Sequence, residues 1–186
     1  MIYASQGLPA SPGIRSQCPL CHEVVIPKCG EIKIWHWAHK SLADCDHWSE
    51  PETEWHKAMK ELFPPNCREV IIPPHRADVR TAKHLVVEFQ HSPISPGEIR
   101  EREDFYGRLV WVVDARTWHV EMLHIEKSLI WANRRAHPAW MSAECPVILD
   151  IGYTLLHIYG YSGSKEGYGE YIERKDLFRR LSAWED

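Results

Sequence analysis

Two short segments, each with one carboxylate among apolar residues, constrain the fold of this chain more than any other feature. Residues 84–90 are rich in β-branched and aromatic types, which predicts a strand with Glu88 and Gln90 on the same face. A carboxylate in such a strand is costly to bury without a partner. Asp78 lies in the preceding Arg-Ala-Asp-Val segment, and a turn at residues 81–83 would bring it beside Glu88. Because two close carboxylates repel each other, the pair predicts a site for Mg²⁺ or Mn²⁺.

The order of an Asp, a turn and then Glu-x-Gln on the next strand is similar to the core motif of the PD-(D/E)xK nuclease superfamily. In such a site the metal polarises the phosphate and activates a water for in-line attack. The motif usually has Lys where this chain has Gln90, and some restriction endonucleases of the superfamily also carry Gln there. The resemblance adds the backbone carbonyl of Phe89 to the two carboxylates as a metal ligand. The alternative is a half-buried hairpin whose carboxylates form ion pairs with Arg76 and Arg80.

Residues 49–63 form the clearest helix pattern in the chain. Its start fits a capping box, apolar residues recur at helical spacing, and a Pro-Pro pair ends it. His56 and Lys60 follow Glu52 at successive i+4 steps. Glu52 is therefore expected at the buried edge of the first turn, either as a capping residue or as the outer acid of the metal site. Glu54 is the second choice for that acid.

A second helix is predicted to begin after Ser95, which opens another capping box, and to run to about Tyr106. Arg102 shares a face with Tyr106 and could hold a metal-site carboxylate or a DNA phosphate. The alternative for residues 101–104 is a solvated charge run, the role expected of their acidic members. The continuous apolar run at residues 108–114 is typical of a central strand buried on both faces.

A cluster of cysteines and histidines lies upstream of these segments. Cys18 and Cys21 have zinc-knuckle spacing, and His36 and His39 follow them. A Cys-x₂-Cys pair with a downstream His-x₂-His pair makes a plausible tetrahedral zinc set. The alternative ligands are Cys29, Cys45 and His47, of which Cys45 is the favoured substitute.

The residues between the two ligand pairs predict a small module. Residues 23–26 and 32–35 suggest a short hairpin, as in a zinc ribbon or treble clef. Such a segment is too small to bury a core of its own, so a structural zinc would supply on the order of 10 kcal/mol of folding free energy. A disulfide framework is the alternative, and the N-terminal sequence does not favour the oxidising compartment that disulfides need.

The order of these motifs resembles the competence protein CoiA-like nuclease family, over about residues 15–115. The resemblance implies an α/β (α+β) fold: a restriction-endonuclease-like mixed sheet flanked by helices, behind an N-terminal zinc module. We accordingly expect a zinc-binding module at residues 1–48 and a nuclease-like domain at 49–186. The chain is short for a competence protein, so only the nuclease part is expected to be shared, and the physiological role is not inferred from the fold. The matching residues are Cys18, Cys21, His36, His39, Glu52, His56, Lys60, Asp78, Glu88, Gln90, Ser92 and Arg102.

The function that follows is a metal-dependent DNA nuclease that processes or recombines foreign or phage DNA. The alternative is a non-catalytic, zinc-containing DNA- or protein-binding module that keeps the nuclease fold, which the Gln in place of Lys favours. A homodimer is also expected, because cleavage of both strands commonly needs two active sites. The expected Mg²⁺ ligands are Glu52, Asp78 and Glu88, the other catalytic residues are Gln90 and His56, and the nucleic-acid contacts are Lys60, Arg76 and Arg102.

Composition sets weaker bounds. The hydrophobic content of 44% is enough for a core, and no apolar run is long enough to predict a membrane span. Residues 1–13 are polar, small and Pro/Gly-bearing, which does not fit a signal peptide, so we expect a cytoplasmic protein. The net charge of −4 is not that of a typical DNA-binding protein, so DNA would have to meet a local basic patch.

The C-terminal third carries less specific patterns. Residues 125–135 suggest a helix, and 146–151 with 154–159 suggest two strands joined at a glycine. The Gly- and Ser-rich residues 162–169 suggest a loop, and 175–184 a terminal helix. This part is expected to complete the sheet, contact DNA or form a dimer interface.

Overall fold

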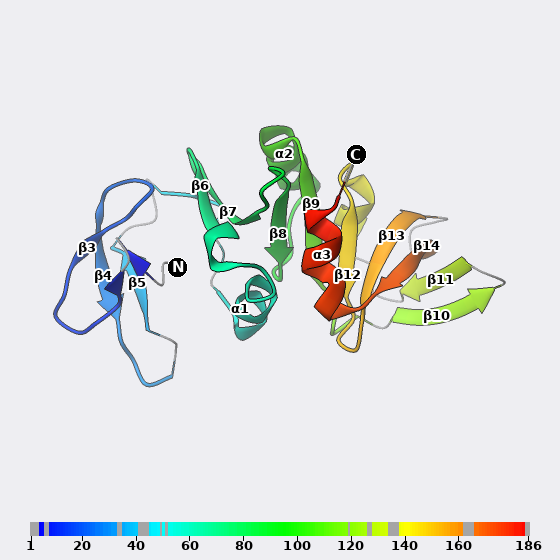
Figure 1. The fold of residues 1–186 in the computed structure, drawn as a ribbon, viewed down its shortest axis with the longest axis horizontal. Helices are drawn as coiled ribbons and strands as arrows, with labels where there is room; N and C mark the ends of the chain where they lie inside the picture. The colour runs from blue at the N-terminus through cyan, green and yellow to red at the C-terminus, as the bar shows by residue number, and fades with distance from the viewer. Residues whose placement is uncertain are drawn as a thin grey trace. The chain divides into compact units, whose positions relative to one another are not determined.

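The chain forms two compact units, each described here by itself (Figure 1). The first contains Met1–Thr53 and Ile71–Arg76, and the second contains Glu54–Val70 and Ala77–Asp186. The computed structural model describes residues 4–5, 8–32, 35–40, 45–48, 50, 52–118, 120–125, 128–133, 138–161 and 166–184.

The first unit is built on a three-stranded antiparallel sheet of β3 (Ser16–Gln17), β4 (Val24–Lys28) and β5 (His36–His39). The short strands β1 (Ala4–Ser5) and β2 (Leu8–Pro9) pair separately. The hairpin expected from residues 23–26 and 32–35 is present as β4 and β5, but its second strand is the His-Trp-Ala-His segment; residues 33 and 34 lie outside the described residues. The fully buried Trp37 explains this placement, since β5 carries it into a small core with Ala10, Cys18 and Val25.

The second unit contains a mixed sheet, in which nine strands follow the order β10-β11-β14-β13-β12-β9-β8-β7-β6. Strands β8, β9 and β12 run parallel to one another, and the pairs β7–β8, β12–β13 and β13–β14 are antiparallel. The ends of β6 and β7 that face their connecting turn are counted in the first unit. The strands are β6 (Arg68–Ile72), β7 (His75–Arg80), β8 (Val86–Gln90), β9 (Leu109–Asp114), β10 (Val120–Ile125), β11 (Ser128–Asn133), β12 (Val147–Asp150), β13 (Leu155–Tyr161) and β14 (Glu166–Ile172).

Three α-helices accompany this sheet: α1 (Glu54–Lys60), α2 (Pro96–Tyr106) and α3 (Leu177–Ser182). Short 3₁₀ turns lie at Pro65–Cys67, Pro138–Ser142 and Arg174–Asp176. α1 begins at Glu54, later than the helix predicted over residues 49–63, and Ser49 of the predicted capping box lies outside the described residues. The predicted cap of α2 is confirmed, because Ser95 Oγ accepts a hydrogen bond from the Glu98 backbone N–H at 3.1 Å. None of the described helices is long and apolar enough to cross a membrane.

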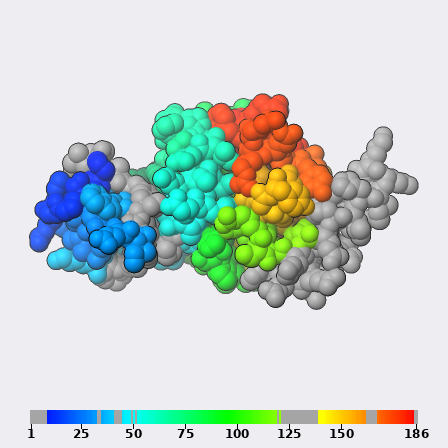
Figure 2. Space-filling view, turned by 90° about the horizontal axis from the view of Figure 1, so that it is seen from below, coloured from blue at the N-terminus to red at the C-terminus, as the bar shows by residue number. Residues whose placement is uncertain are grey.

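Side chains of β8 alternate between the two faces of the sheet, and the two faces pack against different helices. Val87 and Phe89 join a core formed with apolar residues of α1 and α3. Segments of α1 and α3 lie side by side on the face in Figure 2, and the rings of Phe63 and Phe178 are 5.7 Å apart. Glu88 belongs to the other set of the alternation and meets α2. The central strand is thus buried on both faces and carries one acid.

The C-terminal predictions are partly wrong. Strands β10 and β11 pair antiparallel, and β11 occupies residues for which a helix was predicted over 125–135, of which 126–127 and 134–135 lie outside the described residues. The run Leu-Ile-Trp in β11 suits a strand, and pairing with β14 outweighs its weak helix propensity. Of the loop predicted at 162–169, residues 166–169 belong to β14, and 162–165 lie outside the described residues. The hairpin of β12 and β13 is confirmed, as is a helix near the C-terminus.

Candidate metal and catalytic sites

One cluster in the first unit has the chemistry of a zinc site. Single ligand atoms of Cys18, Cys21, His39 and Cys45 all lie within 4.8 Å of one another. Cys18 Sγ and Cys45 Sγ are 3.9 Å apart, and Cys21 Sγ and His39 Nε2 are 3.2 Å apart. Tetrahedral zinc bonds of about 2.0–2.3 Å place neighbouring ligand atoms about 3.5–3.8 Å apart. The cluster therefore fits a metal ion such as zinc with little movement.

The fourth ligand differs from the predicted set. His36 is buried on β5 but is not a member of the group, and Cys45 stands in its place. The prediction of His36 is corrected for a geometric reason. Side chains alternate along a strand, so His36 and His39, three positions apart, point to opposite faces of the sheet. A His-x₂-His pair can share a metal on a helix or a turn, but not along one flat strand.

The electrostatics of the cluster suit a metal. Burial lowers the pKa of His39, which keeps the ring neutral and able to ligate. Burial raises the pKa of Cys45 to about 12, so the thiol is protonated when no metal is bound. The backbone N–H of Leu20 donates to Cys18 Sγ at 3.4 Å, which would stabilise a thiolate there. Metal binding would release the thiol protons.

A second group, Asp46, His47 and His75, lies beside this cluster in the chain and also has ligand atoms within 4.8 Å of one another. Asp46 already accepts three hydrogen bonds: from the backbone N–H of Trp48 at 3.1 Å and of Arg76 at 2.9 Å, and from His75 Nδ1 at 2.8 Å. Trp48 stacks on His75 with ring centroids 3.3 Å apart. This carboxylate joins residues 45–48 to the start of β7.

Asp78 and Glu88 form the acid pair of the second unit. In the antiparallel pairing of β7 with β8, Val79 lies opposite Val87, so Asp78 and Glu88 lie opposite each other at the next position. Each carboxylate accepts a backbone N–H there. Asp78 Oδ2 accepts from the N–H of Phe89 at 2.9 Å, and Glu88 Oε1 accepts from the N–H of Asp78 at 3.2 Å. The predicted proximity of the two acids is thereby confirmed.

Lys60 provides the cation on one side of this pair. Its Nζ lies 3.7 Å from Asp78 Oδ1 and forms a close ion pair with Glu69. Glu69, which the sequence did not single out, has a φ of +54° within β6. This left-handed conformation is unfavourable for a residue with a side chain and recurs at functional sites. Asp78, Glu69 and Lys60 thus make a compact charged group.

Arg102 provides the cation on the other side. This side chain on α2 is buried, and its Nη1 lies 3.2 Å from Glu88 Oε2, while Nη2 forms a close ion pair with Glu98. Burial acts to lower the pKa of Arg102, but the charges of Glu88 and Glu98 outweigh it and raise the pKa. The predicted contact of Arg102 with the site carboxylate is confirmed.

The remaining predicted residues lie at the edges of the pair or in the other unit. His56 Nε2 donates to the carbonyl oxygen of Phe89 at 2.9 Å. Gln90 is buried at the end of β8, and its Nε2 donates to the carbonyl of Ser92 at 2.9 Å. Glu52 and Arg76 belong to the first unit, so their expected roles stay predictions.

Two strand-end acids escaped the sequence analysis. Asp114 and Asp150 end the parallel strands β9 and β12 in register with each other. Asp150 is fully buried and accepts from Arg174 Nη1 at 2.9 Å and Nη2 at 2.7 Å. Asp114 accepts from His91 Nδ1 at 2.7 Å and from the Nε and Nη2 of Arg116, both at 2.8 Å. The sequence does contain a signal for these acids, because each is an Asp at the end of an otherwise apolar strand segment.

Glu103 corrects the expectation of a solvated charge run on α2. It is buried and accepts from Trp111 Nε1 at 2.9 Å and from the backbone N–H groups of Glu144 at 3.0 Å and Cys145 at 3.1 Å. The carboxylate joins α2 to the segment before β12. Its role in the fold is structural.

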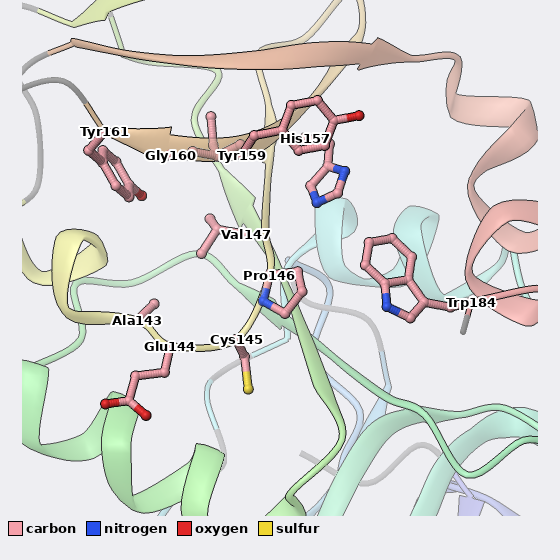
Figure 3. Close-up of a pocket in the computed structure, with 11 residues that line it drawn as sticks. Ala143, Glu144, Cys145, Pro146, Val147, His157, Tyr159, Gly160, Tyr161 and Trp184 are labelled. Carbon is pink, nitrogen blue, oxygen red and sulfur yellow. The ribbon is translucent and has the colours of Figure 1, made fainter. Parts of the chain in front are cut away.

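A pocket of about 400 Å³ lies against the start of β12 and along β13 (Figure 3). Figure 3 shows the rings of His157, Tyr159 and Trp184 on one side of it and Tyr161 on the other. Burial raises the pKa of Cys145, which also lines this pocket, to about 11. The thiol is therefore protonated at neutral pH and unsuited to nucleophilic chemistry.

Comparison with known proteins relates the N-terminal segment to one described family. No curated protein and no solved structure matches the chain. Residues 15–48, which hold all four members of the cysteine–histidine cluster, match the family described as "Competence protein CoiA, N-terminal domain". The match supports the resemblance to CoiA-like proteins over this segment.

Proposed function

We propose that the chain is a divalent-metal-dependent nuclease that hydrolyses phosphodiester bonds of DNA at the pair Asp78 and Glu88. The observation that carries the proposal is the placement of these two acids opposite each other, beside the Phe89 carbonyl. The surrounding order α1–β6–β7–β8–α2–β9, with β8 and β9 parallel, agrees with the core that the PD-(D/E)xK resemblance implies. The match to the CoiA N-terminal domain suggests a competence-related function, in which the substrate would be foreign DNA.

The donor set fits a hard cation. The carboxylates of Asp78 and Glu88 and the carbonyl of Phe89 would hold Mg²⁺ or Mn²⁺, which prefer oxygen ligands. When bound, the ion would polarise the phosphate and lower the pKa of a water. The Phe89 carbonyl oxygen has two lone pairs, so it could ligate the ion while it accepts the hydrogen bond from His56 Nε2. This contact would hold the His56 imidazole beside the ion and the substrate phosphate.

Two cations of the chain would complete this site. Gln90 occupies the place where the motif usually has Lys, but Lys60 brings an ammonium to the same acid pair from α1, 3.7 Å from Asp78. We assign it the contact with the substrate phosphate. Arg102 would hold Glu88 in place, and the amide of Gln90 would orient the water or the phosphate.

The test is cleavage of linear, circular and single-stranded DNA in Mg²⁺ or Mn²⁺ by the wild-type chain, Asp78→Asn and Glu88→Gln. Loss of a metal ligand should reduce the rate by at least ~100-fold. Glu98→Gln is the matched control, because Glu98 also pairs with Arg102 but lies outside the acid pair. Equal cleavage by all four proteins would refute the site, and a wild-type chain that cleaves nothing would refute the activity.

One observation favours a second candidate, a DNA- or protein-binding module without catalysis. Lys60 and Arg102 already flank the acid pair, so its charge is compensated before any metal binds. DNA binding that persists after the divalent ion is replaced by EDTA, with no cleavage in any metal, would support this candidate.

A further inference from the structure

A pocket of about 380 Å³ lies beyond the carboxyl ends of β8 and β9 in the second unit. Open α/β sheets commonly bind ligands at this edge of their parallel strands, and the volume is within the range of small-molecule sites, about 300–1,000 Å³. The wall begins at His91, directly after Gln90, and the Ser92 carbonyl in the same wall accepts from the Gln90 amide at 2.9 Å. The pocket therefore adjoins the strand that carries Glu88.

One buried carboxylate fixes two of the pocket's polar side chains. Asp114 accepts from His91 Nδ1 and from Arg116, and its own side chain is 5% exposed. Arg116 uses its Nε and one Nη2 hydrogen for this contact, so three of the five N–H donors of its guanidinium are directed elsewhere. In the described part of the chain these three donors have no hydrogen-bond partner. A guanidinium held in this way is arranged in advance for an anion such as phosphate.

The charge of Arg116 is secure. Its hydrogen bond to Asp114 raises its pKa, so the group stays cationic at every pH at which the protein folds. Burial acts to raise the pKa of Asp114, but hydrogen bonds from Arg116 and His91 outweigh it and lower the pKa. The two groups form a stable ion pair, and the N–H groups of Arg116 that do not contact Asp114 remain for an anion.

The rest of the lining is aromatic. The buried Trp140, the half-buried Trp118 and the exposed ring of His91 line the same pocket, with a hydroxyl from Thr117. Aromatic faces bind bases of every sequence, because each base has a π-face to stack. A cation for phosphate and rings for a base are the two parts of a single-stranded nucleic-acid site.

We infer that this pocket binds one nucleotide of an unpaired strand, with the phosphate on Arg116 and the base against Trp118 and His91. The inference deepens the proposed function, on which it rests for the choice of DNA. It makes a single-stranded or frayed end the preferred substrate, since a base held in a duplex cannot enter a pocket. The neighbouring phosphate of the same strand would then lie toward Gln90 and the acid pair.

The test is fluorescence anisotropy of a labelled single-stranded dT decamer with the full chain, in Ca²⁺ so that the strand is not cut. Trp118→Ala and Arg116→Gln should each weaken binding by roughly tenfold. Trp118→Phe should restore most of the affinity, which a merely structural role would not require. Arg179→Gln is the matched control, since Arg179 is an exposed cation paired with Asp176 on α3. Thermal unfolding of each variant checks that it is folded.

Two further arms separate the sources of the signal. Free dTMP should bind weakly and compete with the decamer, and a blunt duplex of the same length should bind much less tightly than the single strand. Affinities equal to wild type in folded Trp118→Ala and Arg116→Gln, or equal affinity for the blunt duplex, would overturn the inference. A failure here with cleavage that still depends on Glu88 would leave the nuclease proposal standing. Binding that depends on Trp118 and Arg116, without any cleavage, would support the pocket and refute the nuclease activity.

Discussion

His36 and His39 lie three positions apart on β5, so the strand turns one imidazole toward Cys21 and the other to the opposite face of the sheet. Cys45, from the loop that follows, completes the group in place of His36. Spacing along the sequence therefore places His36 in the candidate metal cluster, whereas the alternation of side chains along β5 excludes it.

Zinc content distinguishes the two ligand sets. We expect about one zinc ion per chain in the wild-type protein, the same in His36→Ala, and a loss in Cys45→Ser. The reason is that a structural site needs all four ligands to hold the ion against chelation. Inductively coupled plasma mass spectrometry of purified proteins measures this. A metal-free His36→Ala with a metal-loaded Cys45→Ser would contradict the assignment.

Arg174→Met should lower the free energy of unfolding by about 3 kcal/mol, since it leaves the fully buried carboxylate of Asp150 without its cation. Urea unfolding of the two proteins measures the difference. Arg179→Met is the control, because the pair of Arg179 with Asp176 is exposed and should contribute no more than about 0.5 kcal/mol. Similar losses for both variants would argue against a special role for the buried pair.

The stability of the second unit should fall as the pH drops below about 6.5. Burial lowers the pKa of His157 from its ordinary 6.5, so the unfolded chain takes up this proton at a higher pH than the folded chain. The stabilisation is therefore complete above the unfolded pKa and is lost as the pH falls toward the folded one. Urea unfolding at pH 7.5 and 5.5 should show a smaller difference in His157→Gln than in wild type. His84→Gln, at an exposed turn position, should keep the wild-type difference.

Gly169→Ala should destabilise the protein by more than about 2 kcal/mol. A Cβ at this position would lie 2.1 Å from the carbonyl oxygen of His157, a backbone atom that cannot move without breaking the contact of β13 with β14. Gly97→Ala is the matched control in α2, where the nearest atom to an added Cβ is Ser95 Oγ at 3.8 Å. This second change should be neutral or slightly stabilising, because alanine favours a helix. Melting temperatures of the two variants test the contrast.

The sequence predicts those parts of the fold whose signals are local. The strand of Glu88, the turn after β7 and the cap of α2 follow from alternation, turn chemistry and Ser95. The meeting of Asp78 with Glu88 follows from the same turn. Arg102 was also placed correctly, because its position on α2 is fixed by helical spacing from the cap.

The predictions that failed depend on partners distant in the chain. β11 pairs with its chain neighbour β10 and with the distant β14, and the second pairing is one that no local pattern reveals. Asp150 was missed because its cation, Arg174, lies far downstream. Asp114 and Glu69 have cations nearer in the chain, Arg116 and Lys60, but each acid is on a strand and its cation is outside that strand, so strand alternation does not reveal the pair.

The acids that end β9 and β12 also affect how a polyanion reaches the molecule. Two adjacent carboxylates at the mouth of parallel strands would repel DNA, and the chain as a whole is already negative, at −4. Arg116 neutralises the charge of Asp114, and Arg174 neutralises that of Asp150, each through a direct ion pair. The two carboxylates therefore add no net negative charge at this edge, and the N–H groups of Arg116 that do not contact Asp114 present a cation to an approaching strand, whose binding should weaken as the ionic strength rises.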